Sequence, residues 1–238
     1  MATELRSQSP AWSIARAMKR AVLIADDHPL FRDALKLAVA QAVPGAQIIE
    51  ADSVDSLFAA LESHPDPELL LLDLNMPGAQ GFNALVQARA HFPAVPIVVI
   101  SAREDRHIMH RALGHGAAAF VPKSASIDLI VGALRAVLSG DTWLPPSAAQ
   151  DNPAALDASE AEATSRLAAL TPQQFRVLSM LSAGLLNKQI AAELGVSEAT
   201  VKAHVSAVMQ KLGVSNRTQA VLLAQKLALD HVTPDPSS

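Results

Sequence analysis

The stretch LLLLDLNMPG at residues 69–78 places four consecutive leucines directly before Asp73 and a Pro-Gly pair. An uninterrupted apolar run is typical of a strand that is covered on both faces, as in a parallel sheet flanked by helices. An acidic residue at the end of such a strand would lie at the carboxyl edge of the sheet, where ligands bind in open α/β folds. Aspartate is also a common turn residue, and this stretch taken alone slightly favours that simpler interpretation.

Residues 21–140 alternate between apolar runs of this kind and stretches with helical periodicity. The five apolar runs lie at residues 21–26, 46–52, 69–74, 96–102 and 117–123. Ser53 and Ser126 are candidate N-caps of the helices that follow the second and fifth runs. Five successive strand-helix units predict a five-stranded parallel sheet with helices on both faces, which is a doubly wound α/β domain.

The composition excludes several classes of protein. Half of the residues are hydrophobic, which excludes wholesale disorder. The absence of cysteine excludes a disulfide framework and a thiolate zinc site, and it suits a reducing cytoplasm. No apolar stretch is long enough to cross a membrane, and residues 1–20 lack the apolar core of a secretory signal. We therefore expect a cytoplasmic protein with no membrane partner and a short N-terminal extension.

Charge is distributed unevenly along the chain. Residues 1–164 contain 12 Lys and Arg against 19 Asp and Glu, whereas residues 165–229 contain 7 against 2. Residues 141–164 combine prolines with five acidic residues and have no Lys or Arg, which is typical of a solvated linker rather than a helix or strand. Beyond this linker the periodicity is only helical. The basic C-terminal part favours a polyanionic partner.

Polar residues at the ends of the predicted strands would gather at one edge of the sheet. Asp26 and Asp27 follow the first strand, Asp73 ends the third, Ser101 the fourth and Lys123 the fifth. Carboxylates held so close together repel one another and need a cation, for which a hard divalent ion such as Mg2+ is suited. With the hydroxyl and the ammonium added, the cluster predicts a site for phosphoryl oxygens.

Four motifs resemble the receiver domain of two-component response regulators across residues 21–140. They are DDHP (26–29), LLDLNMPG (71–78), VVISA (98–102) and FVPK (120–123), and both their order and their spacing agree. The resemblance implies that Asp73 accepts a phosphoryl group from the phosphohistidine of a sensor histidine kinase. It implies a Mg2+ site formed by Asp26, Asp27, Asp73 and the backbone carbonyl of Asn75.

The resemblance also implies roles for residues around the phosphoryl group. Lys123 would pair with it as a point charge, and Ser101 would hydrogen-bond it and draw its loop inward. Phe120 would then change rotamer and fill the vacated space. Small Ala102 would leave the phosphoryl group open to water. The protein is therefore expected to take part in its own Mg2+-dependent phosphotransfer and dephosphorylation, and otherwise not to be an enzyme.

Three histidines in one segment, at positions 107, 110 and 115, raise the question of a second metal site. His107 and His110 are one helical turn apart, but the segment offers no obvious third ligand. We expect all three histidines to lie on the surface, where histidine is commonly found.

The segment from Thr171 onward has the features of a helix-turn-helix. Thr171 and Gln174 form a predicted capping box, with Pro172 at the first helical position. In NKQIAAELGVSEATVKAHVSAVMQKLGV, Gly195 permits a tight turn between two helices, and Ser197 can cap the second. That second helix carries an apolar stripe at positions 201, 205, 208 and 212. Its opposite face is small and polar with flanking cations, which fits a DNA major groove.

LTPQQFRVL, NKQIAAELGVSEATVKAHV and KLGVSNRTQAV resemble the LuxR-type helix-turn-helix, a small all-α module of four helices. The resemblance implies a dimer surface around Val221. It implies contacts with double-stranded DNA from Lys188, Lys202, Ala203, His204, Ser206, Lys211 and Arg217. Because each module has few cations, one copy should bind DNA weakly and in a salt-dependent way, and pairing of two copies should be the point of control.

The sequence therefore predicts an N-terminal extension (1–20), a receiver domain (21–140), a linker (141–168), a LuxR-type DNA-binding domain (169–230) and a tail (231–238). The predicted function is that of a NarL/FixJ-type transcription regulator that is phosphorylated on Asp73 and is a homodimer when active. One alternative is a regulator that works without phosphorylation. Another is a Mg2+-dependent phosphatase of the haloacid dehalogenase type, but that class should carry a second acid where this chain has Asn75.

Overall fold

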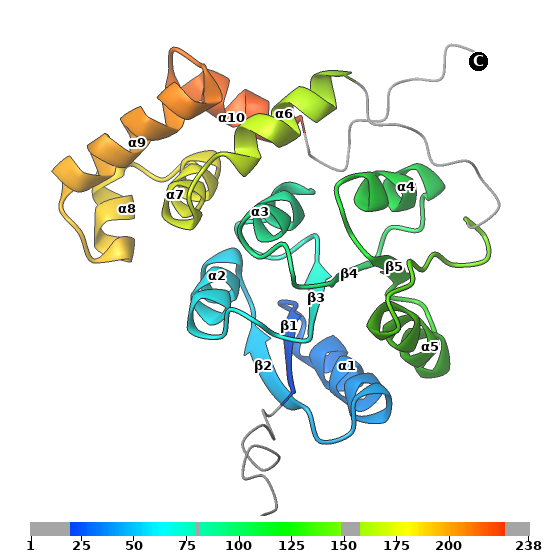
Figure 1. Ribbon diagram of the computed structural model, residues 1–238. Coiled ribbons are helices and arrows are strands. Elements are labelled where there is room, and N and C mark those ends of the chain that lie inside the picture. The colour runs from blue at the N-terminus through cyan, green and yellow to red at the C-terminus, as the bar shows by residue number, and fades with distance from the viewer. Residues whose placement is uncertain (1–19, 80, 149–157, 227–238) are drawn as a thin grey trace, which may run out of the picture.

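A single parallel sheet forms the centre of the N-terminal domain in the computed structural model, which describes residues 20–79, 81–148 and 158–226 (Figure 1). The strand order is β2-β1-β3-β4-β5, and every neighbouring pair is parallel. The strands are β1 (Ala21–Ala25), β2 (Gln47–Ala51), β3 (Leu69–Asp73), β4 (Ile97–Ser101) and β5 (Ala119–Pro122). All five predicted strands are thus confirmed, as is the doubly wound topology. Nearly all of the predicted extension and the whole predicted tail lie outside the described residues.

The leucines of β3 lie at the centre of the sheet and divide between its two faces. Leu69 and Leu71 face one layer of side chains, and Leu70 and Leu72 face the other, because successive side chains of a strand alternate. All five residues of β3 are buried. The apolar run is therefore explained by a central strand that is covered on both sides.

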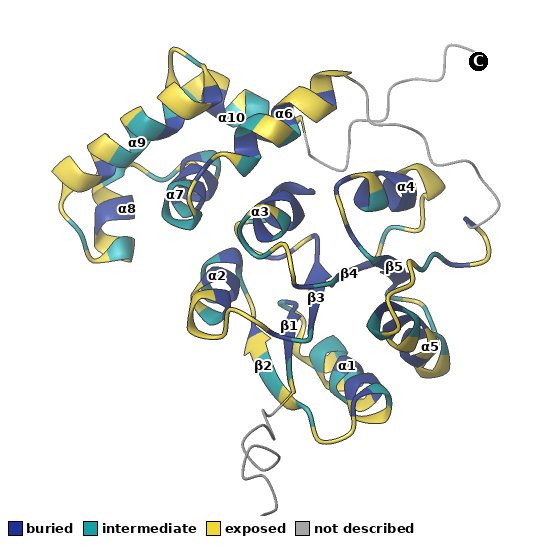
Figure 2. Cartoon of the chain, in the orientation of Figure 1, coloured by how far each residue is buried: buried dark blue, intermediate teal, exposed yellow. Residues whose placement is uncertain are grey.

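Two helical layers cover the sheet (Figure 1). On one face lie α1 (Pro29–Ala42) and α5 (Ile127–Leu138), and on the other lie α2 (Val54–Ser63), α3 (Asn83–His91) and α4 (Arg106–Gly114). Figure 2 shows that the central strands are buried, whereas α1 and α5 expose their outer sides. The predicted caps are confirmed, since Ser53 forms a capping box with Ser56 and Ser126 accepts a hydrogen bond from the backbone N–H of Leu129.

The C-terminal domain contains the four predicted helices, α7 (Pro172–Ser182), α8 (Asn187–Leu194), α9 (Glu198–Leu212) and α10 (Arg217–Gln225). Thr171 and Gln174 form the predicted capping box. Gly195 ends α8 in the left-handed conformation, with φ of 65°, which glycine adopts without strain. Val201 is fully buried and belongs to a cluster that joins α7, α8 and α9.

The predicted linker contains a further helix, α6 (Ala158–Ala168). The expectation that residues 141–164 form only a solvated linker is therefore wrong for their last part. The physical reason is tertiary, because Ala163 and Leu167 are fully buried against the rest of the molecule. Composition alone does not reveal a short helix whose stability comes from the surface on which it packs.

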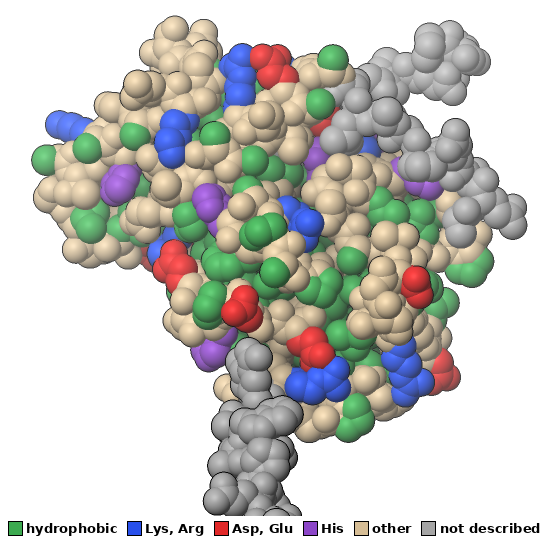
Figure 3. All heavy atoms as spheres, in the orientation of Figure 1, with side chains coloured by type: hydrophobic (Ala, Val, Ile, Leu, Met, Phe, Trp, Pro, Cys, Tyr) green, Lys and Arg blue, Asp and Glu red, His purple; other side chains and the backbone are tan. Residues whose placement is uncertain are grey.

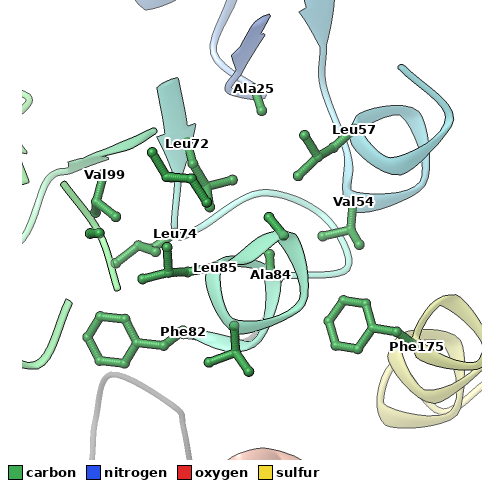
Figure 4. Close-up of a cluster of buried hydrophobic side chains, with 14 of the residues drawn as sticks. Ala25, Val54, Leu57, Leu72, Leu74, Phe82, Ala84, Leu85, Val99 and Phe175 are labelled. Atoms are coloured by element: carbon green, nitrogen blue, oxygen red, sulfur yellow. The ribbon is translucent and has the colours of Figure 1, made fainter. Parts of the chain in front are cut away.

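The receiver-like domain and the helical domain share one hydrophobic core. The cluster on the α2–α3–α4 side of the sheet continues into α6, α7, α9 and α10. The ring of Phe175 in α7 lies edge-on to that of Phe58 in α2, with their centroids 5.7 Å apart. Figure 4 shows the Phe175 side chain reaching from α7 toward Val54 and Ala84. In this structure the two domains are therefore docked.

Two of the three histidines that were expected on the surface are buried. His107 is exposed, but His110 and His115 are each only 5 % exposed. The expectation is thus wrong for His110 in α4 and for His115, the residue that follows α4. His115 is covered in part by α6, whose Glu160 and Thr164 contact the imidazole ring.

Within the described part of the chain, no helix is long and apolar enough to span a lipid bilayer.

Replacing Leu71 by Ala should strongly destabilise the sheet domain. Leu71 is fully buried and pairs with Ile24 and Val98, so its truncation leaves a cavity and costs about 2–5 kcal/mol of unfolding free energy. Urea unfolding followed by far-UV circular dichroism measures this loss. Leu37→Ala is the matched control, because Leu37 is 58 % exposed, and it should change the unfolding free energy by less than about 0.5 kcal/mol.

Candidate functional site

The predicted acidic cluster assembles at the carboxyl edge of the sheet. Asp26 follows β1, Asp73 is the last residue of β3 and Ser101 is the last residue of β4, and all three have no exposed surface. Because β1 and β3 are adjacent and parallel, their ends bring the first two carboxylates together. Lys123 follows β5, and its backbone N–H donates to the carbonyl of Ser101.

The ammonium of Lys123 bridges the two buried carboxylates. Its Nζ lies 2.7 Å from Oδ2 of Asp26 and 2.9 Å from Oδ2 of Asp73. The same Nζ lies 5.0 Å from the centre of the Phe31 ring, which places a cation over an aromatic face. Two carboxylates and one ring therefore define the position of this ammonium.

Backbone N–H groups hold the remaining carboxylate oxygens. Oδ1 of Asp73 accepts from the N–H of Asn75 at 3.1 Å, and Oδ1 of Asp26 accepts from the N–H of His28 at 2.7 Å. The imidazole Nδ1 of His28 also lies 2.6 Å from Oδ1 of Asp27. These contacts orient the acidic side chains before any ligand arrives.

Burial and charge determine the protonation of the site. Burial raises the pKa of the Asp73 carboxyl above its usual value, although the Lys123 ammonium and the Asn75 N–H oppose this effect. For Lys123, burial lowers the pKa, but the hydrogen bonds to Asp26 and Asp73 outweigh it, and the net pKa is raised. The ammonium therefore stays charged at neutral pH and offsets part of the repulsion between the acids.

The acidic residues also fit a divalent cation. One ligand atom from each of Asp26, Asp27, His28 and Asp73 lies within 4.8 Å of the others, the only such group among the described residues. Carboxylate oxygens at this spacing are suitable ligands for Mg2+, which prefers oxygen. The three predicted carboxylate ligands are thus brought together, whereas the Asn75 carbonyl stays a prediction.

A cavity of about 420 Å³ opens directly over Asp73. Asn75, Ala102 and Lys123 line it together with the apolar side chains of Leu30 and Phe31. Leu30 is 87 % exposed at its rim. The buried Asp73 is thus one of the residues that border a cavity at the edge of the sheet.

The two predicted switch residues lie in different surroundings. Oγ of Ser101 accepts a hydrogen bond from the N–H of Arg103, which ties it to the loop before α4. The side chain of Phe120 is fully buried in the cluster on the α2–α3–α4 side of the sheet. Their roles in switching remain predictions.

The predicted DNA contacts divide into two groups. Lys188 of α8 is exposed, as are Lys202, Ala203 and Ser206 of α9, and His204 of α9 is half-buried. By contrast, Lys211 donates to the carbonyl of Ala169 at 2.9 Å, and Arg217 donates to those of Leu181 and Leu185 at 3.1 and 2.8 Å. The last two side chains thus stabilise the helical domain itself. On the face shown in Figure 3, Lys and Arg side chains are scattered over this domain rather than gathered in one patch.

The predicted dimer residue, Val221, is half-buried on α10. Nearby Leu222 is 56 % exposed, whereas Ala224 is buried and its carbonyl accepts from Nδ2 of Asn83 in α3 at 3.1 Å. One side of α10 is therefore occupied by the docked domain and the other is open.

Sequence reasoning missed a buried charge cluster between the domains. Arg111 of α4 and His115, the residue after α4, both contact the carboxylate of Glu160 in α6. The sequence signal was weak, because Glu160 belongs to an acidic stretch that resembles a linker. The histidine was noticed, but its burial depends on a helix that was not predicted.

Comparison with known proteins agrees with this architecture. Residues 22–135 match the response regulator receiver domain, and residues 168–224 match the luxR family of bacterial regulatory proteins. The chain is 40% identical over 207 residues to the glycerol metabolism activator of Pseudomonas putida, covering 85% of this chain and 94% of that protein. It is 31% identical over 201 residues to the nitrate/nitrite response regulator protein NarL of Escherichia coli K12, covering 84% and 93%.

A solved structure of similar fold is that of RcsB from Salmonella enterica serovar Typhimurium, bound to a promoter in the presence of phosphomimetic BeF3-. It is 23% identical, covers 88% of this chain and 100% of that one, and has a TM-score of 0.51. This similarity shows the shared fold.

Replacing Asp73 by Asn should stabilise the sheet domain at neutral pH. Because the pKa of Asp73 is higher in the folded protein than in the unfolded chain, protonation of this carboxyl stabilises the folded state. This stabilisation is fully present below the usual carboxyl pKa and is lost as the pH rises through the folded-state pKa. The neutral amide should therefore raise the unfolding free energy at pH 7 by about 1 kcal/mol, because a buried charge is costly. The gain should vanish near pH 3.

Urea unfolding at the two pH values measures this difference. Asp66→Asn, at an exposed position, is the control and should leave stability unchanged at both. If Asp73→Asn instead lowers the unfolding free energy at pH 7, burial of the charged Asp73 carboxylate does not destabilise the folded protein.

Proposed function

The chain belongs to the NarL/FixJ family of two-component response regulators, and from this premise we propose that it regulates transcription under the control of phosphorylation at Asp73. Its receiver domain precedes a LuxR-type DNA-binding domain. The observation that carries the proposal is the Asp73 carboxylate at the base of an open cavity, held between an ammonium and a backbone N–H.

The proposed reaction is a phosphoryl transfer to an oxygen of Asp73. A carboxylate oxygen attacks the phosphorus of the phosphohistidine of a sensor histidine kinase, so that a P–O bond forms and the P–N bond breaks. The imidazole leaves with the electron pair and takes up a proton. Lys123 lies beside the attacked position and neutralises charge on the phosphoryl oxygens, and Ser101 supplies a hydrogen bond.

Asp26, Asp27 and Asp73 fit a Mg2+ ion, together with the backbone carbonyl of Asn75. When bound, the ion supplies positive charge that compensates the acids and the incoming phosphoryl group. Lys123 carries part of that function through its own contacts with Asp26 and Asp73.

The output is control of DNA binding in the cytoplasm. The exposed side of α9, with Lys202, Ala203 and Ser206, is small and cationic enough to enter a major groove. Phosphorylation shifts an existing equilibrium, with Ser101 and Phe120 as the switch, toward a homodimer that pairs through α10 around Val221. Two linked modules bind neighbouring half-sites more tightly than one.

The phosphatase alternative lacks its second acid, because residue 75 is an asparagine and its backbone N–H is committed to Asp73. Regulation without phosphorylation is the remaining alternative, and the intact set of site residues argues against it.

The first test is phosphorylation of the full chain by acetyl phosphate and Mg2+, resolved on a phosphate-affinity gel. The wild type should give a shifted band that Asp73→Asn does not give, and size-exclusion chromatography of the same sample should show a dimer. If neither acetyl phosphate nor a cognate kinase shifts the wild type while DNA binding persists, the phosphate-independent alternative is correct.

The second test concerns Lys202. Lys202→Ala should weaken DNA binding and reduce the slope of log affinity against log salt by about one, because one phosphate contact is lost. Fluorescence anisotropy with an operator fragment at several salt concentrations measures this slope. Lys36→Ala, in the receiver, is the control and should leave the slope unchanged.

A further inference from the structure

Helix α6 packs against the receiver with a stripe that includes an acidic residue. Glu160, Ala163 and Leu167 are its buried residues, at a spacing that places them on one side of the helix. Ala163 and Leu167 join the shared hydrophobic core. A glutamate in such a stripe is unusual, because a buried carboxylate is costly unless it is paired and hydrogen-bonded.

The pairing comes from the C-terminal half of α4 and the residue after it. Oε1 of Glu160 lies 2.8 Å from Nε and 2.6 Å from Nη2 of Arg111, and 2.8 Å from Nε2 of His115. The side chains of Arg111 and His115 are 4% and 0% exposed. One carboxylate on α6 is thus held by two side chains of the receiver, an arrangement that we call the Glu160 clamp.

Neighbouring groups fix the geometry of the clamp. The guanidinium of Arg111 lies 4.9 Å from the centre of the Phe82 ring, and the His115 ring lies 4.8 Å from the same ring. Oγ1 of Thr164 lies 3.3 Å from Nδ1 of His115. Burial lowers the pKa of His115, although Glu160 opposes this effect, so the ring is neutral at pH 7 and contributes a hydrogen bond rather than a charge.

The other polar contacts between the domains have a different character. Gln87, His91 and Asn83 of α3 bond to backbone carbonyls of the C-terminal part, at Leu167, Leu170 and Ala224 respectively. The ion pair of Arg176 with Asp55, at 2.7 Å, is partly exposed. Only the Glu160 clamp, among these contacts of the described residues, buries an ion pair. Removing one of its partners would therefore leave a charge buried between the domains.

The clamp is linked to the phosphorylation site through α4. The loop before α4 begins at Ser101, whose Oγ accepts from the N–H of Arg103, and the helix carries Arg111 near its other end. A movement of Ser101 toward a phosphoryl group would therefore pull on the loop that leads into the helix that holds Glu160. In the docked state, Lys202, Ala203 and Ser206 of α9 are exposed. Docking therefore restrains the position of the DNA-binding domain but does not cover these predicted DNA contacts.

We propose that the Glu160 clamp is the release point between the two domains: intact, it keeps the DNA-binding domain docked on the receiver, and its rupture through α4 frees that domain. This inference rests on the proposed function for phosphorylation of Asp73 as the trigger. The contacts of Glu160 with Arg111 and His115 do not depend on it. A buried ion pair suits such a role, because loss of one partner leaves an uncompensated charge that only undocking can hydrate.

The experiment measures docking in the unphosphorylated full chain by energy transfer between two dyes. The chain has no cysteine, so Ser63→Cys in α2 and Ser215→Cys before α10, both exposed, provide two labelling sites, one on each domain. Glu160→Gln should lower the transfer efficiency by raising the ratio of undocked to docked molecules by about tenfold or more. Arg111→Gln tests the clamp from the receiver side and should act in the same direction.

Glu162→Gln is the matched control. Glu162 lies on the same helix, its side chain is 60% exposed and it pairs with Arg166 within α6, so the substitution should leave the transfer unchanged. The double variant Glu160→Gln/Arg111→Gln should open less than the two single effects combined, because the substitutions remove one shared interaction. Far-UV circular dichroism verifies that each variant is folded.

Three results would overturn the proposal. Glu160→Gln could show the same transfer efficiency as the wild type, or Glu162→Gln could lower the transfer efficiency as much as Glu160→Gln does. The third is a double variant whose effect on docking equals the sum of the two single effects. A separate arm adds acetyl phosphate and Mg2+ to the wild type and to Asp73→Asn. If phosphorylation undocks only the wild type while Glu160→Gln without phosphodonor stays docked, the clamp is refuted and the proposed function stands. If the wild type is never phosphorylated, the proposed function fails. The comparison of Glu160→Gln with the wild type without phosphodonor still shows whether the Glu160 clamp holds the domains together.

Discussion

The repulsion between two buried carboxylates, Asp26 and Asp73, is the constraint on which the site depends. Both side chains are withdrawn from solvent at the edge of the sheet, and the ammonium of Lys123 bridges them. The adjacency of β1 and β3 imposes the repulsion, and the position after β5 provides the compensating charge. The resulting site carries an excess of negative charge that favours a divalent cation, and Asp73 borders the adjoining cavity.

A buried carboxylate paired with a cation also occurs between the two domains. Apolar contacts such as that of Phe175 with Phe58 hold the two domains together without directional preference. The ion pair of Glu160 with Arg111 adds a directional contact that is strong when complete and costly when one partner is lost. The proposed release uses this combination, because a displacement of α4 would leave the buried Glu160 without its charged partner.

Much of this architecture was predictable because its determinants are local. The leucines of β3 indicate a buried strand, the serines and Thr171 mark helix starts, and Gly195 marks a turn that requires a left-handed residue. The acidic cluster was predictable for a related reason. Once the strands are parallel, the residues at their carboxyl ends must share one edge, so Asp26, Asp73 and Lys123 meet without further information.

The failures concern residues whose environment is provided by distant parts of the chain. His110 and His115 are buried because other elements cover them, and α6 forms because its apolar side packs on the receiver. The sequence likewise did not reveal that Arg217, whose DNA contact stays a prediction, donates to carbonyls within its own domain. The two folds, their order and the residues of the acidic cluster followed from the amino-acid sequence alone, because strand alternation, capping and parallel topology act over short distances. The docking of the domains and the pairing of Glu160 were decided only by tertiary structure, since burial depends on which surfaces meet.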